Sequence, residues 1–143
     1  MATDPSTPPV PTAFAATAFF SKTYDEARDL LIDARDYLRV MEPVRWGRLA
    51  VSLAHSLETT RLTTRLTHIM AWLMVQRAVD AGEITRREAR EEAHRLGGQS
   101  VCLDVGAEDS LTLPGQLRAL LQRSRMLYQR VARLEEMLMR DPG

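Results

Sequence analysis

The sequence predicts an all-α protein: an antiparallel three-helix bundle with a short extra helix in the second connection, which we expect to form a homodimer. Three long stretches place apolar residues alternately three and four positions apart, the spacing of one face of an α-helix. No Gly or Pro interrupts the chain from Arg48 to Ala81. The 143 residues, 45% hydrophobic and 27% charged, suit one domain with one core.

The bundle domain is expected over residues 15–140, after a Pro- and Thr-rich tail over residues 1–14 whose composition predicts disorder. The tail lacks a basic start followed by an apolar stretch, so we do not expect a signal peptide. The first helix should begin near Phe19 and end before Pro43, because the residue before a proline avoids the helical region. Its apolar seam consists of Phe20, Tyr24, Ala27, Leu31, Ala34, Leu38 and Met41.

The second helix should begin at Arg45 or Leu49 and run to Ala81, with Gly82 as its C-terminal stop. It carries apolar or small residues on two faces. One stripe consists of Leu49, Leu53, Leu57, Thr60, Thr64, Thr67 and Ala71, and the other of Leu62, Leu66, Ile69 and Leu73. A helix that is apolar on two sides needs partners on both, and one of these can come from a second subunit. We expect the Leu62–Leu73 row in the bundle core or the dimer seam.

A capping box, Thr85 followed by Glu88, predicts a short charged helical piece up to Leu96 that lies on the surface. Residues 97–112 are expected to form a loop. The last helix should begin near Pro114, since proline is favoured in a first turn. Its seam consists of Leu113, Leu117, Leu120, Ser124, Leu127, Val131, Leu134 and Leu138. The short first connection is typical of antiparallel neighbours.

No catalytic, cofactor or metal site is evident in the sequence. The three histidines, His55, His68 and His94, include no pair spaced four apart, which would put two ligands on one helix face. His55 and Glu58 form only half of a two-ligand helical pair. Cys102 is the single cysteine, so it forms no internal disulfide, and its neighbours in sequence include no base to activate it. We therefore expect a protein that is not an enzyme.

Charge and hydropathy disfavour two classes of partner. The net charge is zero and the pI is about 6.8, whereas nucleic-acid binders usually carry a basic excess. The longest nearly apolar stretch, around residues 69–75, is far too short to span a bilayer. The expected protein is soluble and cytoplasmic, with neither nucleic acid nor membrane as its partner.

One polar cluster stands out on the second helix. Glu58, Arg61 and Arg65 lie within two turns among several threonines, and Arg61 and Arg65 face the same way. Three interpretations remain open. The arginines could fix register or subunit pairing within the structure, form a recognition surface for an acidic partner, or line an anion pocket inside the bundle that supports a small helical enzyme.

The last helix carries a second polar cluster, formed by Tyr128, Arg130 and Arg133. Tyrosine and arginine are enriched at binding hot spots, and they are also common at the rims of bundles. Together with the first cluster, these residues are the candidates for partner binding.

Four stretches carry a family resemblance: FFSKTYDEARDLL, SLETTRLTTRLTHIMAWLMVQRAVDAGE, RLGGQSVCLD and LPGQLRALLQRSRMLYQRVARLEEML, over residues 19–138. In extent and order they resemble the alphaproteobacterial regulator of CtrA degradation (RcdA-like) family. The resemblance implies a homodimeric three-helix bundle that serves the ClpXP protease as an adaptor, helping to deliver cell-cycle regulators of the CtrA type. It also implies a single-domain response regulator (CpdR-like) and a cyclic-di-GMP effector (PopA-like) as partners, and recruitment to the cell pole.

The resemblance has one departure, at the C-terminus. The best-known family member continues past the third helix in a flexible tail, whereas this sequence ends at Gly143, so the resemblance leaves open any function that such a tail carries. Two alternatives to the adaptor stay open: a small enzyme or anion-binding bundle using Arg61 and Arg65, and a purely structural dimerisation module.

Overall fold

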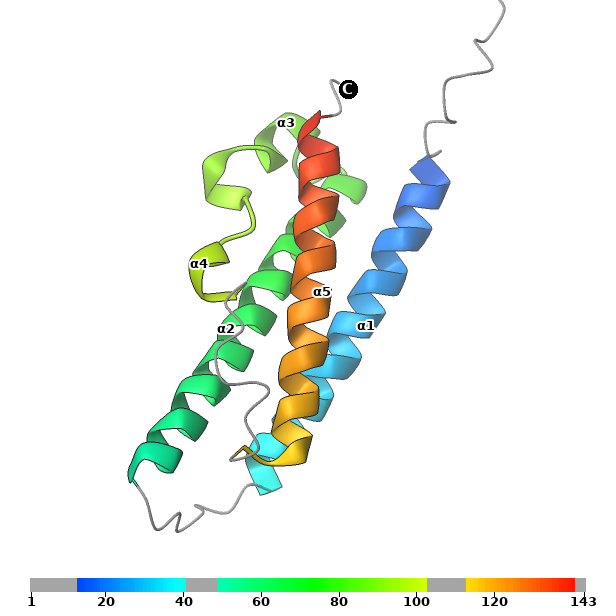
Figure 1. The fold of residues 1–143 in the computed structure, drawn as a ribbon. Coiled ribbons are helices and arrows are strands. Elements are labelled where there is room, and N and C mark those ends of the chain that lie inside the picture. Colours follow the sequence, from blue (N-terminus) through cyan, green and yellow to red (C-terminus); the bar gives the residue numbers. More distant parts are fainter. Residues whose placement is uncertain (1–12, 41–48, 103–112, 141–143) are drawn as a thin grey trace, which may run out of the picture.

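The computed structural model describes residues 13–40, 49–102 and 113–140. Side chains are described from residue 19 onward in the first helix and from residue 53 onward in the second. The described chain is all helical, as the sequence predicts (Figure 1). The helices are α1 (Ala13–Val40), α2 (Leu49–Asp80), α3 (Arg86–Ala89), the 3-10 turn η1 (Glu92–His94), α4 (Gln99–Cys102) and α5 (Gly115–Arg140). None of them is long and apolar enough to cross a membrane.

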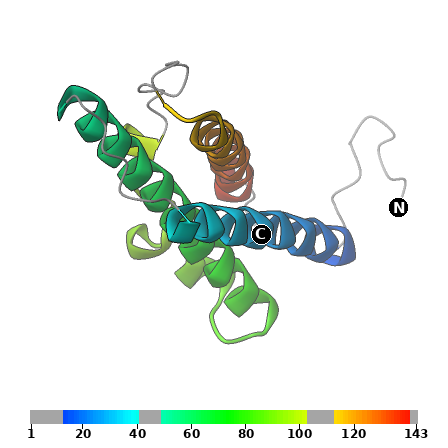
Figure 2. The same cartoon turned by 90° about the horizontal axis from the view of Figure 1, so that it is seen from below.

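The three long helices do not alternate in direction. Figure 1 shows α1 running opposite to both α2 and α5, whereas α2 and α5 start at the same end of the molecule. The prediction of an antiparallel bundle is therefore correct for α1 and wrong for the α2–α5 pair. The reason lies in the second connection, which returns along α2: Leu96 bonds to Glu135 late in α5, whereas Cys102 bonds to Arg65 in the middle of α2. Seen from below, α1 and α2 cross at an open angle (Figure 2).

The core lies where the three long helices face one another. On α1 the buried side chains are Thr23, Ala27, Leu30, Ala34 and Tyr37. The predicted α1 seam shares Ala27 and Ala34 with this row, but its Leu31 is 41% exposed. Because α1 packs against two helices, the buried sector is centred one residue earlier than a single seam suggests. Met41 and Pro43 lie outside the described residues.

The two stripes of α2 have different surroundings. Leu62, Leu66, Ile69 and Leu73 are all buried within the single chain, next to Trp72. The other stripe points outward, with Leu53 55% and Leu57 66% exposed. The predicted seam of α5 is buried from Leu113 to Val131, and its last two leucines are half-buried. Additional buried residues on α5 are Leu121, Tyr128 and Glu135.

The segment after α2 is more deeply built into the fold than predicted. The capping box is confirmed, because the Thr85 side chain accepts a hydrogen bond from the Glu88 amide. However, Leu96 is buried, and residues 99–102 form α4 where a loop was expected. Gly98 adopts φ +73°, and a Cβ there would come 2.7 Å from the His68 ring, so only glycine fits. Residues 103–112 of the expected loop lie outside the described residues.

Candidate functional site

Arg65 lies in the centre of the bundle with no exposed surface. Its Nε donates to the Cys102 carbonyl at 2.7 Å, and its Nη1 donates to the Leu121 carbonyl at 3.0 Å and to Ser124 Oγ at 3.2 Å. One guanidinium thus connects α2, α4 and α5, because its fork of donors reaches several acceptors at once. Arg65 therefore cannot contact a partner on the surface, and the recognition interpretation is wrong for this residue.

Two further buried side chains, Tyr128 and Glu135, bond to the segment of residues 96–102. The Tyr128 hydroxyl donates to the Gly97 carbonyl at 2.6 Å, and the Leu96 amide donates to Glu135 Oε2 at 2.6 Å. Together with Arg65, these bonds satisfy backbone groups of residues 96–102 that lie away from water. Tyr128 is fully buried, so its proposed contact with a partner is also corrected to an internal role.

Burial controls the chemistry of the thiol and the phenol in this region. Burial raises the pKa of the Cys102 thiol, although the positive charge of Arg65 opposes the shift. Burial, with the proximity of Cys102, also raises the pKa of Tyr128. Both groups stay protonated at neutral pH, so Cys102 is not a thiolate nucleophile.

The remaining candidates on α2 form an ion pair. Arg61 Nη1 lies 2.8 Å from Glu58 Oε1 and 2.9 Å from Oε2, and both side chains are largely buried. The sequence spacing correctly places these two residues close together, because they lie one turn apart on the same face of the helix. The hydroxyls of the nearby threonines donate to backbone carbonyls of α2 itself, which leaves Arg61 and Glu58 as the charged pair in this part of the helix.

The arginines on α5 lie near the surface. Arg130 donates to both carboxylate oxygens of Glu26 on α1, at 2.6 and 3.0 Å. This hydrogen bond raises the pKa of Arg130, which stays charged. Arg133 is exposed. Of the second predicted cluster, only Arg130 and Arg133 are placed where a partner could reach them.

His55 is engaged inside the bundle. The Tyr37 hydroxyl lies 2.9 Å from His55 Nε2, which in the neutral ring can accept a hydrogen bond from that hydroxyl. Burial lowers the pKa of His55 below its ordinary value of 6.5 and raises that of Tyr37. Among the residues that the structure describes, no group of three His, Cys, Asp or Glu side chains could hold a metal ion.

The state of His55 predicts a pH dependence of stability. Because the folded protein binds the His55 proton more weakly than the unfolded chain does, the free energy of unfolding should decline as pH falls below about 6.5 and be flat above it. Urea unfolding of the wild type and of His55→Gln at pH 7.5 and 5.5 measures this. The variant should lose less stability between the two pH values. An equal loss in both proteins would show that other groups cause the decline.

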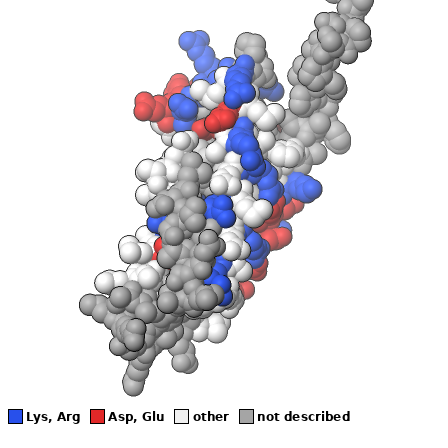
Figure 3. All heavy atoms as spheres, in the orientation of Figure 1, with Lys and Arg blue, Asp and Glu red and all other residues white. Residues whose placement is uncertain are grey.

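The outward stripe of α2 forms an uncharged surface along the helix. We name as the outer stripe Leu53, Leu57, Thr60, Thr64, Thr67, Ala71 and Met74. Every exposed position from Leu53 to Met74 is uncharged. The threonine hydroxyls of the stripe donate to carbonyls four residues earlier in the same helix, so each hydroxyl keeps a hydrogen-bond acceptor when water is excluded from the stripe. Figure 3 shows charged side chains gathered over α3 and along the α5 side instead.

Comparison with known proteins fits this architecture. A family model described as "Protein of unknown function (DUF1465)" matches residues 12–142. The chain is similar to the crystal structure of RcdA from Caulobacter crescentus CB15, with 31% sequence identity and a TM-score of 0.61. That match covers 83% of this chain and 89% of the other. No curated protein matches the chain. The chain therefore belongs to the DUF1465 family and is RcdA-like.

Proposed function

We propose that this protein is a non-enzymatic adaptor in regulated proteolysis, working as a homodimer through protein–protein contacts. The observation that carries the proposal is the similarity to RcdA over most of both chains. In its finer form, the proposal is that the adaptor helps to deliver cell-cycle regulators of the CtrA type to ClpXP. A CpdR-like response regulator and a PopA-like cyclic-di-GMP effector would act with it, in the cytoplasm and at the cell pole.

The side-chain geometry supports a binding role over the enzyme alternative. An anion pocket using Arg61 and Arg65 needs guanidinium groups that face a cavity. Arg65 instead bonds two carbonyls and a hydroxyl in the core, and Arg61 bonds Glu58. Arg65 could bind a substrate only by giving up its contacts, which would leave buried polar groups unsatisfied, and the charge of Arg61 is already balanced by Glu58.

The homodimer is proposed to form through the outer stripe. From Leu53 to Met74 the stripe covers 21 residue steps, about 32 Å of helix at 1.5 Å per residue. Isolated exposed leucines are ordinary, but an uncharged face of this length is typical of an interface. Because the stripe has no charge, it can face a second copy of itself without like-charge repulsion, as a two-fold interface requires.

Leu57→Asp tests the proposed interface. Leu57 is 66% exposed, so the aspartate remains solvated in the monomer and the fold should persist. In a dimer the same carboxylate would be buried without a partner, and the dissociation constant should rise at least about 30-fold. Sedimentation velocity measures the dimer fraction.

The matched control is Met126→Asp on α5, where the side chain is 58% exposed and outside the outer stripe. This variant should remain as dimeric as the wild type. If Leu57→Asp stays dimeric at the same concentration, the outer stripe is not the interface.

The adaptor role itself is tested by reconstituted degradation. Purified ClpXP, a CtrA-type substrate and the response regulator are incubated with and without this protein, and the substrate half-life is measured. A shorter half-life that depends on this chain supports the adaptor. An unchanged half-life with an intact dimer would contradict it, and a pull-down that recovers only a second copy of the chain would then favour a structural dimerisation module.

A further inference from the structure

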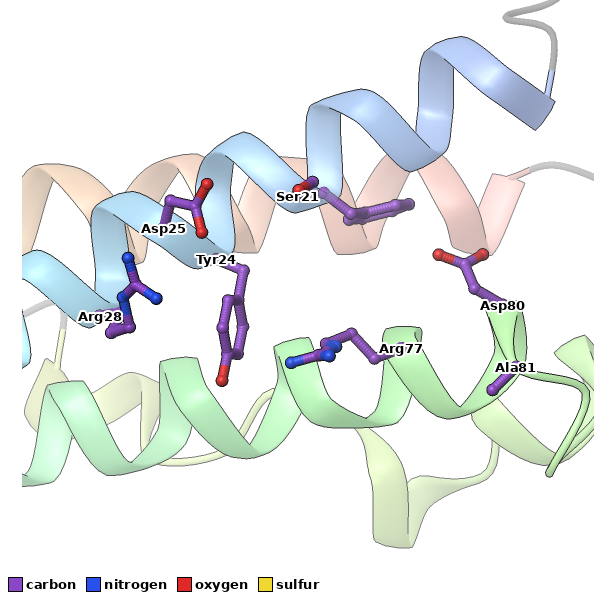
Figure 4. A pocket seen from close by; sticks show the side chains of 8 residues that line it. Ser21, Tyr24, Asp25, Arg28, Arg77, Asp80 and Ala81 are labelled. Carbon is purple, nitrogen blue, oxygen red and sulfur yellow. The ribbon is translucent and has the colours of Figure 1, made fainter.

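We infer that a groove between α1 and the end of α2 binds a short extended peptide segment with an acidic residue at one end and a basic residue at the other. The groove has a volume of about 630 Å³. Its α1 side runs from Phe20 to Arg28, and its α2 side is formed by Arg77, Asp80 and Ala81 (Figure 4). This inference deepens the proposed function, because an adaptor needs a site for a segment of its partner.

Two aromatic side chains, Phe20 and Tyr24, line the groove. Phe20 contacts Trp72 of the core, with ring centroids 5.9 Å apart. The Arg77 guanidinium lies 4.6 Å from the centre of the Tyr24 ring. This cation–π contact holds the position of Arg77 while leaving its N–H groups able to donate to a carboxylate. The rings thus offer apolar surface for the middle of a peptide, next to a positioned cation.

Four charged side chains line the groove without pairing. In the part of the chain that the structure describes, none of Asp25, Arg28, Arg77 and Asp80 forms an ion pair. Elsewhere on α1, Glu26 pairs with an α5 arginine. Unpaired charges of both signs in one groove are suited to a ligand that carries both signs itself.

The charges are arranged in order along the groove. In Figure 4, Arg28 and Arg77 lie on either side of the Tyr24 side chain, whereas Asp80 lies beyond Arg77 at the end of α2. Asp25 lies beside Arg28 and opposes anion binding there, whereas the Arg77 guanidinium is held in place over the Tyr24 ring. The C-terminal end of α2 adds negative potential around Asp80, which favours a cation there. An acidic ligand residue therefore belongs near Arg77 and a basic one near Asp80.

The dimensions fit a peptide of about four residues. Phe20 to Arg28 covers eight residue steps, about 12 Å of helix. An extended chain at about 3.3 Å per residue covers that length with four residues, and its terminal Glu and Arg side chains reach inward to Arg77 and Asp80, which lie three residue steps apart on α2. The lining charges are exposed and the groove is open to solvent, which suits a segment crossing the surface better than an enclosed small molecule.

The test adds blocked tetrapeptides to the full chain and measures binding from the shifts of its backbone amides in an NMR titration. The probe is acetyl-Glu-Leu-Leu-Arg-amide, compared with versions in which Gln replaces either the Glu or the Arg. The wild type should bind the doubly charged probe about three- to fivefold more tightly than either replaced peptide, the range for exposed charge pairs. Amide shifts should centre on Phe20, Tyr24 and Arg77.

Each charge preference should depend on one groove residue. In Arg77→Gln the advantage of Glu over Gln should vanish while the advantage of Arg remains, and Asp80→Asn should do the reverse. A merely structural role would weaken all three peptides equally. Arg133→Gln, an exposed arginine on α5, is the matched control and should keep both preferences.

Two results would overturn the inference: no groove shifts at millimolar peptide, or charge preferences that survive in both variants. Because the titration contains only this chain and a peptide, it is independent of the degradation assay. A protein that binds the peptide and fails to shorten substrate half-life would contradict the adaptor alone.

Discussion

Leu66→Asp is expected to unfold the chain rather than only to dissociate it. Leu66 is 3% exposed in the core between the three long helices. The substitution removes a packed side chain and buries an unpaired carboxylate, which together should cost about 4 kcal/mol or more. This approaches the whole stability of a typical domain. Far-ultraviolet circular dichroism and urea unfolding measure the loss.

Leu57→Asp supplies the control for Leu66→Asp, because it makes the same chemical change on the same helix at an exposed position. It should keep its helical signal, and the free energy of unfolding of its monomer should stay within about 1 kcal/mol of that of the wild-type monomer. A Leu66→Asp protein that unfolds with the same midpoint as Leu57→Asp would show that the inner row of α2 is not the core.

Arg65→Met is expected to lower the free energy of unfolding by about 3 kcal/mol, since the buried Cys102 carbonyl loses a charge-assisted hydrogen bond. The loss at Leu121 should be smaller, because Ser124 Oγ also donates to that carbonyl. Arg65→Lys should still cost about 2 kcal/mol, since an ammonium cannot reproduce the guanidinium fork.

Urea unfolding measures both Arg65 variants, with Arg123→Met as the control. Arg123 pairs with Asp33 at the surface, and such pairs contribute less than about 1 kcal/mol. Hydrogen exchange should show the largest loss of protection in residues 96–102 of the Arg65 variants. If Arg65→Met is as stable as the wild type, the hydrogen bonds of Arg65 make no net contribution to stability, and the assigned role of Arg65 is wrong.

Periodicity predicted the helices well because burial on one face leaves a repeating mark in the sequence. It located α2 and α5 closely and identified two rows on α2, but it did not decide which of them lies inside the single chain. The direction of α5 was not predictable in the same way. It depends on tertiary contacts of residues 96–102, which carry no period of their own.

The internal roles of Arg65 and Tyr128 were harder to predict, because polar residues are usually read as surface. A signal was nevertheless present. Arg65 lies three residues after Leu62 and four before Ile69, so it occupies an inward position of the same row. Tyr128 lies seven residues after Leu121 and equally belongs to a second inward row of α5. Position in the row was a better guide than residue type.

The shared direction of α2 and α5 has a consequence for the order of folding. The contact between Tyr37 and His55 joins residues 18 apart in sequence, whereas Arg65 reaches Leu121 across 56 residues and Arg130 reaches Glu26 across 104. Short loops close faster, so α1 and α2 should form a hairpin first and α5 should dock last. During synthesis, the inner leucines of α2 therefore remain uncovered until the final helix has left the ribosome.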